Sequence, residues 1–346
     1  MSTIPIELMG VDTPDGRTPM PAHRLPDFVI AGAPKAGTTA LHAALATHPQ
    51  LYLSPVKEPK YYLTGDRPPG RSGHRGPGDA HSAREWVWRR EEYLALFDDA
   101  PAEALTGEST PFYLYDRDAH ARLAEDVPGI KVIAVVRDPV DRAWSNWVHL
   151  RADGLEPEAD FLTAVRREPE RIADGWAPFW HYRGLGRYGE QLRDILEHLP
   201  PEQVLVLRYR RLVDTPRELL DRVSRFLGVD EGLAHTVPPE NVKPFVHDTP
   251  QHRVLGRLAR AGAALGAHAH PQVWRRLSAP LIAAMHAGRA ARPEMPVEVR
   301  REVLEPLLPD IALLEELTGE SFADWKGDTG RGHFGSRRTT SAGSGR

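Results

Sequence analysis

The segment Ala33-Pro-Lys-Ala-Gly-Thr-Thr39 carries residue types that bind an anionic group. Glycine lets the backbone approach a ligand closely, the two threonines offer hydroxyl donors, and the lysine adds a positive charge. The segment separates an apolar run typical of a strand from an Ala- and Leu-rich run typical of a helix. Its N–H groups are therefore expected at a helix N-terminus, where the helix dipole favours anions. We predict a phosphate-binding loop made of Lys35, Ala36, Gly37, Thr38 and Thr39.

A second segment, Val135-Val-Arg-Asp-Pro-Val-Asp-Arg-Ala-Trp-Ser-Asn146, has residues that suit another phosphate. Arg137 ends an apolar strand, and parallel sheets bind ligands at the carboxyl ends of their strands. Pro139 then begins a helix that carries Ser145. Arginine binds phosphate through two parallel hydrogen bonds, and the serine can donate a further one. Taken alone, the segment also fits a surface Arg–Asp pair followed by an ordinary helical serine.

The elements that must position these residues follow an alternating pattern. Short apolar runs predict strands, and amphipathic runs between them predict helices. The strands are expected at 27–32, 104–108, 130–136 and 203–208, and clear helices at 188–199 and 216–227. This alternation indicates an α/β fold with a central, mostly parallel sheet flanked by helices.

Length and composition narrow the class of protein. The 346 residues are 41% hydrophobic and 27% charged, with a net charge of −4, which disfavours a nucleic-acid partner. The chain has no cysteine, so disulfides and thiolate chemistry are excluded. It shows no secretory signal and no apolar stretch long enough for stable membrane insertion, which predicts a cytoplasmic protein. The expected organisation is an extended N-terminal segment (1–25), one domain (26–326) with a mobile insertion (64–84) and a helical acceptor-side region (253–292), and a disordered tail (327–346).

Together, the two phosphate motifs resemble those of the sulfotransferases that use 3′-phosphoadenosine 5′-phosphosulfate (PAPS). The resemblance rests on Pro34-Lys-x-Gly-Thr-Thr39 and on Arg137-Asp-Pro with Ser145 eight positions later, and it extends over about 27–228. It is strongest for the bacterial branch, which is similar to the Golgi carbohydrate sulfotransferases. The resemblance implies a P-loop-like three-layer fold and transfer of a sulfuryl group to a hydroxyl of a carbohydrate or natural product.

The resemblance also implies roles for individual residues. The loop of Lys35 would hold the 5′-phosphosulfate, with the lysine stabilising the leaving phosphate. Arg137 and Ser145 would hold the 3′-phosphate, and Tyr209 matches a tyrosine that lies near the adenine in some members. Lys243 loosely matches a basic segment that closes over the donor. Some relatives carry an adenine-stacking tryptophan where this chain has Ala40, so the adenine contact differs.

Two glutamates are candidates for the general base. Glu58 lies in Pro55-Val-Lys-Glu-Pro-Lys-Tyr-Tyr62, which resembles the segment that carries the base in the carbohydrate branch. Its alternative role is a solvated ion pair with a neighbouring lysine. Glu108 lies in Gly107-Glu-Ser-Thr-Pro111, where relatives often carry Glu followed by Lys. Here Ser109 replaces that lysine, and Glu108 is expected either to support the site or to be the base itself.

The sequence says less about metals and the acceptor. The sixteen histidines show no metal-binding spacing on a helix, so we predict no metal and expect most histidines to be exposed. The acceptor is expected to be a small molecule or a glycan. Six aromatic residues either line its site or belong to the core: Trp86, Trp88, Trp176, Phe179, Trp180 and Tyr182.

Two other functions remain open on the sequence alone. An ATP-dependent small-molecule kinase would need an atypical phosphate loop, because Lys35 precedes Gly37 instead of following it, as well as Mg²⁺. A non-catalytic nucleotide-binding module is the second alternative, which the unusual Ser109 keeps open.

Overall fold

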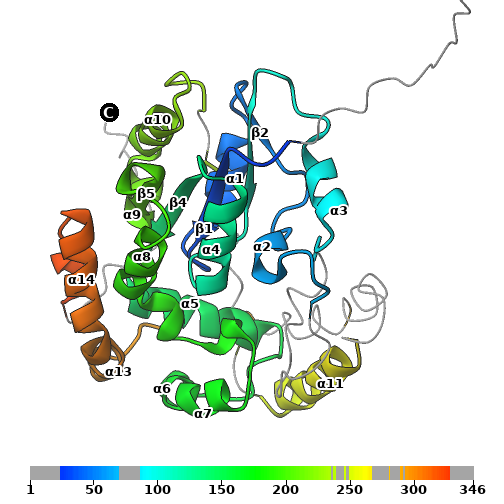
Figure 1. The fold of residues 1–346 in the computed structure, drawn as a ribbon. Coiled ribbons are helices and arrows are strands. Elements are labelled where there is room, and N and C mark those ends of the chain that lie inside the picture. The colour runs from blue at the N-terminus through cyan, green and yellow to red at the C-terminus, as the bar shows by residue number, and fades with distance from the viewer. Residues whose placement is uncertain are drawn as a thin grey trace, which may run out of the picture.

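A five-stranded, all-parallel sheet in the order β2-β3-β1-β4-β5 forms the centre of the protein (Figure 1). The structure is a computed structural model that describes residues 24–69, 86–234, 237–238, 245–246, 249–266, 280, 289–290 and 293–327. The strands are β1 (Phe28–Gly32), β2 (Leu51–Leu53), β3 (Leu105–Ser109), β4 (Lys131–Val136) and β5 (Val204–Arg208).

The two central strands are buried on both faces. Every residue of β1 is buried, and in β4 only the first residue is partly exposed. Continuous apolar runs of this kind are typical of central parallel strands, since helices cover both sides of the sheet. The predicted α/β fold is confirmed, and the four strands predicted from the sequence agree with the structure to within one residue at each end.

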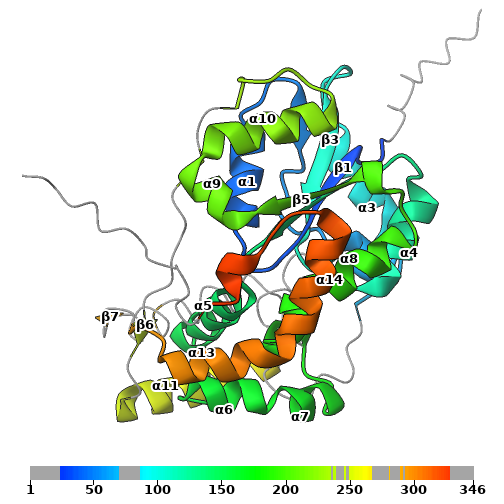
Figure 2. The same cartoon turned by 90° about the vertical axis from the view of Figure 1, so that its left-hand side faces the viewer.

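Helices cover both faces of the sheet (Figure 2). α1 (Thr38–Leu45), α9 (Tyr209–Asp214) and α10 (Pro216–Leu227) lie on one face. α4 (Arg117–Asp126), α8 (Tyr188–Leu196) and α14 (Leu308–Thr318) lie on the other. The other α-helices within the described residues are α2 (Tyr61–Thr64), α3 (Arg90–Leu94), α5 (Pro139–Ala152), α6 (Phe161–Arg166), α7 (Glu168–Ala173), α11 (Pro250–Gly266) and α13 (Val297–Leu304).

Helix α5 directly follows β4 and is fixed firmly at its beginning. Asp138 caps it by accepting hydrogen bonds from the N–H groups of Val140 and Asp141. The same carboxylate forms a buried ion pair with Arg300 of α13, which also donates to the carbonyl oxygen of Trp325 (3.0 Å). The first turn of α5, beside the carboxyl ends of the strands, is therefore tied to the C-terminal part of the chain.

The region predicted at 253–292 is described only in part. Its first portion is helical, as α11, which agrees with the prediction. However, Arg289–Ala290 is a short strand, β7, paired antiparallel with β6 (Phe245–Val246), and the sequence analysis did not predict strand there. Residues 1–23, 70–85 and 328–346 lie outside the described residues, so the proposed segment boundaries stay predictions. No helix in the described part of the chain has the length and apolarity needed to cross a membrane.

Candidate active site

The loop between β1 and α1 forms a backbone cradle. Lys35 and Gly37 have φ angles of 67° and 89°, and Gly37 is the N-cap of α1. A Cβ atom at Gly37 would lie 2.8 Å from Cδ2 of Tyr209, so only glycine fits in this left-handed position. Because Gly37 has no side chain, no side-chain hydrogen bond caps this end of α1. The arrangement fits an anionic group at the helix N-terminus.

Arg137 joins the second motif to this loop. It follows the last residue of β4, is 8% exposed, and donates from Nη1 to the carbonyl oxygen of Lys35 (3.1 Å). Its guanidinium carbon lies 4.6 Å from the centre of the Tyr209 ring. A pocket of about 290 Å³ opens beside these side chains, with Arg208 and Trp325 also in its wall. The fold therefore brings Lys35, Gly37, Arg137 and Tyr209 together.

The other predicted donor ligands differ in their exposure. Thr38 is buried, whereas Thr39 is exposed. Ala36 is fully buried, and its N–H donates to the carbonyl oxygen of Ala33 (3.1 Å), so it shapes the loop from within. Ser145 lies half-buried on α5. Lys243 lies outside the described residues.

The side chain of Lys35 meets a histidine that the sequence analysis did not single out. Its Nζ atom lies 3.1 Å from Nδ1 of His149 on α5. Nε2 of the same ring faces Oδ2 of Asp153 at 3.6 Å. The signal available in the sequence was spacing, since His149 follows Ser145 by four residues and so shares its helix face.

The expectation that most histidines are exposed is wrong for those whose exposure the structure describes. His48, His120 and His181 are buried, and only His198 is exposed. His42 lies close to Lys57 and Glu58, and burial lowers its pKa to about 4, with a smaller contribution from the charge of Lys57. At neutral pH, therefore, His42 adds no positive charge beside Glu58.

Glu58 lies in a conformationally strained loop. Its φ angle is 63°, and that of Lys60 is 66°; left-handed non-glycine residues cost energy and cluster at functional sites. The N–H of Glu58 donates to the carbonyl oxygen of Ser109 (2.9 Å), and the N–H of Lys60 donates to Oγ1 of Thr110 (3.2 Å). The carboxylate is 30% exposed and is paired with Lys57. In this structure, therefore, Glu58 makes the ion pair with a neighbouring lysine that its alternative role predicts.

Glu108 differs from Glu58 in its exposure, because its side chain is fully buried. It accepts hydrogen bonds from the hydroxyls of Thr110 (2.7 Å), Tyr113 (2.7 Å) and Tyr93 (3.3 Å). Burial raises its pKa to about 7, with a smaller contribution from the charge of Glu58, while the three hydroxyls act in the opposite direction. Through Thr110, this carboxylate is linked by hydrogen bonds to the loop that presents Glu58.

The raised pKa of Glu108 predicts a pH-dependent cost to folding. An unfolded glutamate titrates near 4.5, but the folded value is about 7. Between these values the unfolded chain has lost the proton that the folded chain still holds, so the free energy of unfolding falls as the pH rises. At about 1.4 kcal/mol per pKa unit, the upper limit is about 3 kcal/mol. Between about pH 5 and pH 7, the free energy of unfolding measured with urea is expected to fall less for Glu108→Gln than for the wild-type protein. Equal falls in the two proteins would contradict the raised pKa of Glu108.

The six predicted aromatic residues divide into two that are buried and four that are partly buried, namely Trp86, Trp88, Trp176 and Phe179. Trp180 and Tyr182 are buried core residues, so they do not line an acceptor site. Phe179 is only partly buried and packs edge-on against Phe112 and against His149, with ring centres 5.9 Å and 5.6 Å apart. Of these three rings, that of His149 contacts Lys35, and those of Phe179 and Phe112 follow it in series.

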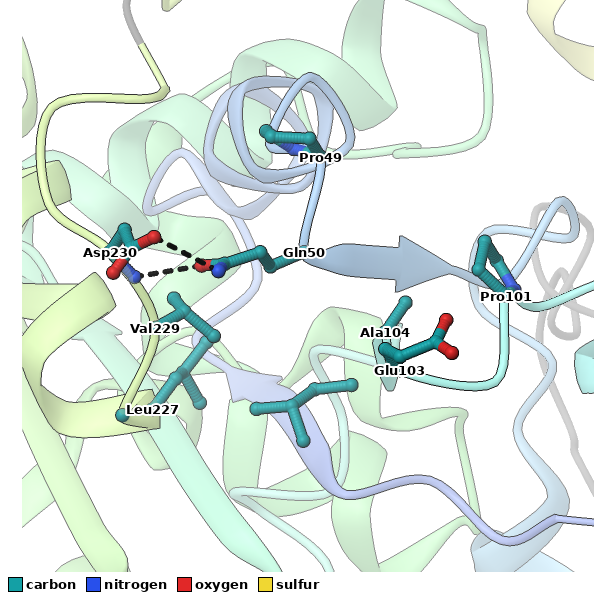
Figure 3. A pocket seen from close by; sticks show the side chains of 10 residues that line it. Pro49, Gln50, Pro101, Glu103, Ala104, Leu227, Val229 and Asp230 are labelled. Carbon is teal, nitrogen blue, oxygen red and sulfur yellow. Dashed lines mark hydrogen bonds between the residues drawn. The ribbon is translucent and has the colours of Figure 1, made fainter.

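A second pocket lies at the other end of the sheet (Figure 3). It has a volume of about 380 Å³ and is lined by residues beside the first residues of β2 and β3, including Glu103. Two of its lining residues, Gln50 and Asp230, are joined by two hydrogen bonds, of 3.0 Å and 2.8 Å. Lys35 and Arg137 follow the last residues of their strands, so this pocket is separate from the candidate site. Within the described residues there is no group of three or more acidic or histidine side chains that could hold a metal; metal independence stays a prediction.

Comparison with known proteins agrees with this geometry. The model of the sulfotransferase family matches residues 26–232. The heparan sulfate glucosamine 3-O-sulfotransferase 3B1 of Mus musculus is 31% identical over 207 residues, which cover 60% of this chain and 47% of that protein. The bifunctional heparan sulfate N-deacetylase/N-sulfotransferase 3 of Mus musculus is 31% identical over 218 residues, which cover 60% of this chain and 22% of that protein. The chain thus spans less than half the length of these curated relatives.

A solved structure extends the likeness to most of the chain. The sulfotransferase from Alicyclobacillus acidocaldarius has a TM-score of 0.65 and 26% sequence identity, covering 88% of this chain and all of that one. The family match includes the loop of Lys35, the Arg137 motif and Tyr209, which the fold brings together. The chain belongs to the sulfotransferase family, whose members use PAPS as the sulfuryl donor.

Proposed function

We propose that this protein transfers a sulfuryl group from PAPS to a hydroxyl of a carbohydrate or natural-product acceptor and releases adenosine 3′,5′-bisphosphate. The observation that carries the proposal is the convergence of Lys35, Gly37 and Arg137 on one anion-binding cradle. The donor supplies the activated sulfuryl group, and the side chains of this chain bind, orient and neutralise charge around it.

We assign the binding of the donor to the loop that contains Lys35 and to residues that follow β4. The first N–H groups of α1 and the ammonium of Lys35 are suited to the 5′-phosphosulfate, because both present positive charge to it. Arg137 and Ser145 are suited to the 3′-phosphate, with Tyr209 beside the arginine. As the bond between sulfur and the bridging oxygen breaks, Lys35 neutralises the negative charge that appears on the leaving phosphate.

We assign to Glu58 the role of the general base that takes the proton of the acceptor. When the acceptor oxygen bonds to sulfur, its proton must go to a base, and a partly exposed carboxylate can reach it. Glu58 fits this role because it is accessible and is presented by a strained loop. The ion pair with Lys57 has to open for the proton to be received, at little cost because both side chains are partly exposed.

Glu108 is assigned a supporting role. Its buried carboxylate is surrounded by three hydroxyl donors and is not open to an acceptor. It acts through Thr110, whose hydroxyl donates to Glu108 while its oxygen accepts from the N–H of Lys60. This arrangement favours Glu58 over Glu108 as the base.

The nature of the relatives supports a sugar-like acceptor. The two curated relatives are named for heparan sulfate, a glycan. The rings of Phe112, Phe179 and His149 lie in series from Lys35, and partly exposed aromatic rings are surfaces on which a sugar ring can pack. We therefore place a carbohydrate or a glycosylated natural product on this side of the site.

Calorimetric titration tests the donor assignment. Adenosine 3′,5′-bisphosphate is expected to bind without Mg²⁺, and Arg137→Ala is expected to weaken it by about 2–3 kcal/mol, or about 30- to 150-fold in Kd. The control is Arg225→Ala, which removes an exposed arginine paired with Glu231 and should leave Kd unchanged. Preference for Mg-ATP, or no effect of Arg137→Ala, would overturn the proposal in favour of a kinase or another nucleotide-binding protein.

A further inference from the structure

Lys35 is held at both of its ends by residues of one neighbouring segment. At the backbone, Arg137 donates to its carbonyl oxygen (3.1 Å). At the tip of the side chain, its ammonium meets Nδ1 of His149 (3.1 Å). The backbone of Lys35 is itself in the left-handed region, at φ 67°. Three independent features thus fix the direction in which this lysine projects.

The contact with Lys35 determines the proton arrangement of the histidine ring. A lysine ammonium has hydrogen-bond donors and no acceptor, so Nδ1 of His149 must be the acceptor. The ring proton of a neutral histidine then lies on Nε2, which faces the carboxylate of Asp153 at 3.6 Å. Asp153 is 4% exposed at the C-terminal end of α5, where its negative charge attracts this N–H.

The ring is also fixed by packing. His149 lies on the second half of α5, and its side chain is only 18% exposed. Phe179 contacts it edge-on, and the carbonyl oxygen of Phe179 accepts a hydrogen bond from Asn146 (2.9 Å), one turn earlier on the same helix. These contacts restrain the ring of His149, so its hydrogen-bond acceptor Nδ1 has a fixed position relative to Lys35.

We propose that His149, oriented by Asp153, is a positioning residue that holds the ammonium of Lys35 at the phosphate loop. This inference rests on the proposed function, since it gives Lys35 the role of stabilising the leaving phosphate. A free lysine side chain samples many rotamers, and ordering it has an entropic cost. His149 provides that order before the donor arrives, so the charge is already in place when the reaction needs it.

The first test needs neither donor nor acceptor. The chain contains only six lysines, so the side-chain ammonium signals of a ¹⁵N-lysine sample can be separated by NMR and that of Lys35 assigned with Lys35→Arg. His149→Phe keeps an aromatic ring against Phe179 but has no acceptor, whereas His149→Asn keeps an acceptor near the place of Nδ1. The Lys35 signal is expected to shift or disappear by exchange broadening in His149→Phe and to persist in His149→Asn. An unchanged signal in His149→Phe would overturn the proposal.

The second test separates positioning from general stability. His149→Phe is expected to lower kcat about 10-fold or more, with Kd for adenosine 3′,5′-bisphosphate within about 2-fold of wild type, and His149→Asn to retain most of kcat. In a Lys35→Ala background, His149→Phe is expected to have no further effect, because its target is gone. Equal losses in the Phe and Asn variants, or additive losses with Lys35→Ala, would overturn the inference.

The two tests also distinguish this inference from the proposed function. Failure of the wild-type protein to bind adenosine 3′,5′-bisphosphate would remove the proposed function, whatever the NMR result. Normal binding together with a Lys35 signal that ignores His149 would remove only the role of His149. If His149→Phe does not fold, equal kcat losses in His149→Asn and Lys35→Ala would overturn the proposal, and near-normal kcat in His149→Asn would support it.

Discussion

Replacing Lys35 with alanine is expected to lower kcat by about 10²- to 10³-fold while leaving KM for the acceptor nearly unchanged. The reason is that the ammonium acts on charge that develops only as the leaving phosphate separates, and fixed charges of this kind contribute most in the transition state. Its place in the cradle, held by Arg137 and by His149, supports this role. Initial rates with radiolabelled PAPS and a range of acceptor concentrations measure both constants.

The matched control for Lys35→Ala is Lys326→Ala. Lys326 is a partly exposed lysine paired with Glu315, far along the chain from the loop, and its loss should leave kcat within about 2-fold. A Lys35→Ala protein with near-normal kcat contradicts the assignment. So does a loss of affinity for adenosine 3′,5′-bisphosphate with kcat unchanged, because that result makes Lys35 a ligand for the donor and nothing more.

Glu58→Gln is expected to lower kcat by about 10²- to 10⁴-fold, the range that general base catalysis contributes. The amide has nearly the same shape as the carboxylate but cannot take the acceptor proton. Glu108→Gln is expected to cost much less in kcat, because its carboxylate acts through Thr110 and the loop. Single-turnover rates with saturating donor separate the chemical step from product release.

Two comparisons make the Glu58 prediction decisive. Glu103→Gln removes a carboxylate from the pocket of Figure 3, at the opposite end of the sheet, and should leave the rate unchanged. If Glu108→Gln abolishes turnover and Glu58→Gln does not, the base assignment is wrong and the buried carboxylate has to become accessible during the reaction. Equal losses in both variants would mean that the loop geometry matters more than proton transfer.

The elements that the sequence predicted best are those set by local pattern. β1 and β4 are runs of apolar residues long enough for buried strands, and the glycine in the loop after β1 stands where only glycine fits. Arg137 and Tyr209 each follow directly after a strand, so the parallel sheet brings them to one edge. Placement at a strand end predicted a ligand-binding position for Arg137, whereas Tyr209 was assigned through the family resemblance.

Contacts between side chains distant in sequence were not predictable in the same way. Glu58 and Glu108 looked alike in the sequence, and only the packing of Tyr93 and Tyr113 around Glu108 makes one buried and the other exposed. His149 reaches Lys35 across 114 positions, so no local pattern could pair them. The histidines were misjudged for the same reason, since their burial depends on which helices cover them.

The ion pair between Arg300 and Asp138 has a consequence for how relatives of this protein can exchange parts. Asp138 belongs to the family match, which ends at residue 232, whereas Arg300 lies beyond it. The carboxylate of Asp138 thus caps a helix inside the family match and pairs with a cation outside it. A chimera that borrowed its C-terminal helices from a relative would have to bring an equivalent cation with them. Without it, a buried aspartate would lose its counter-charge one residue away from Arg137.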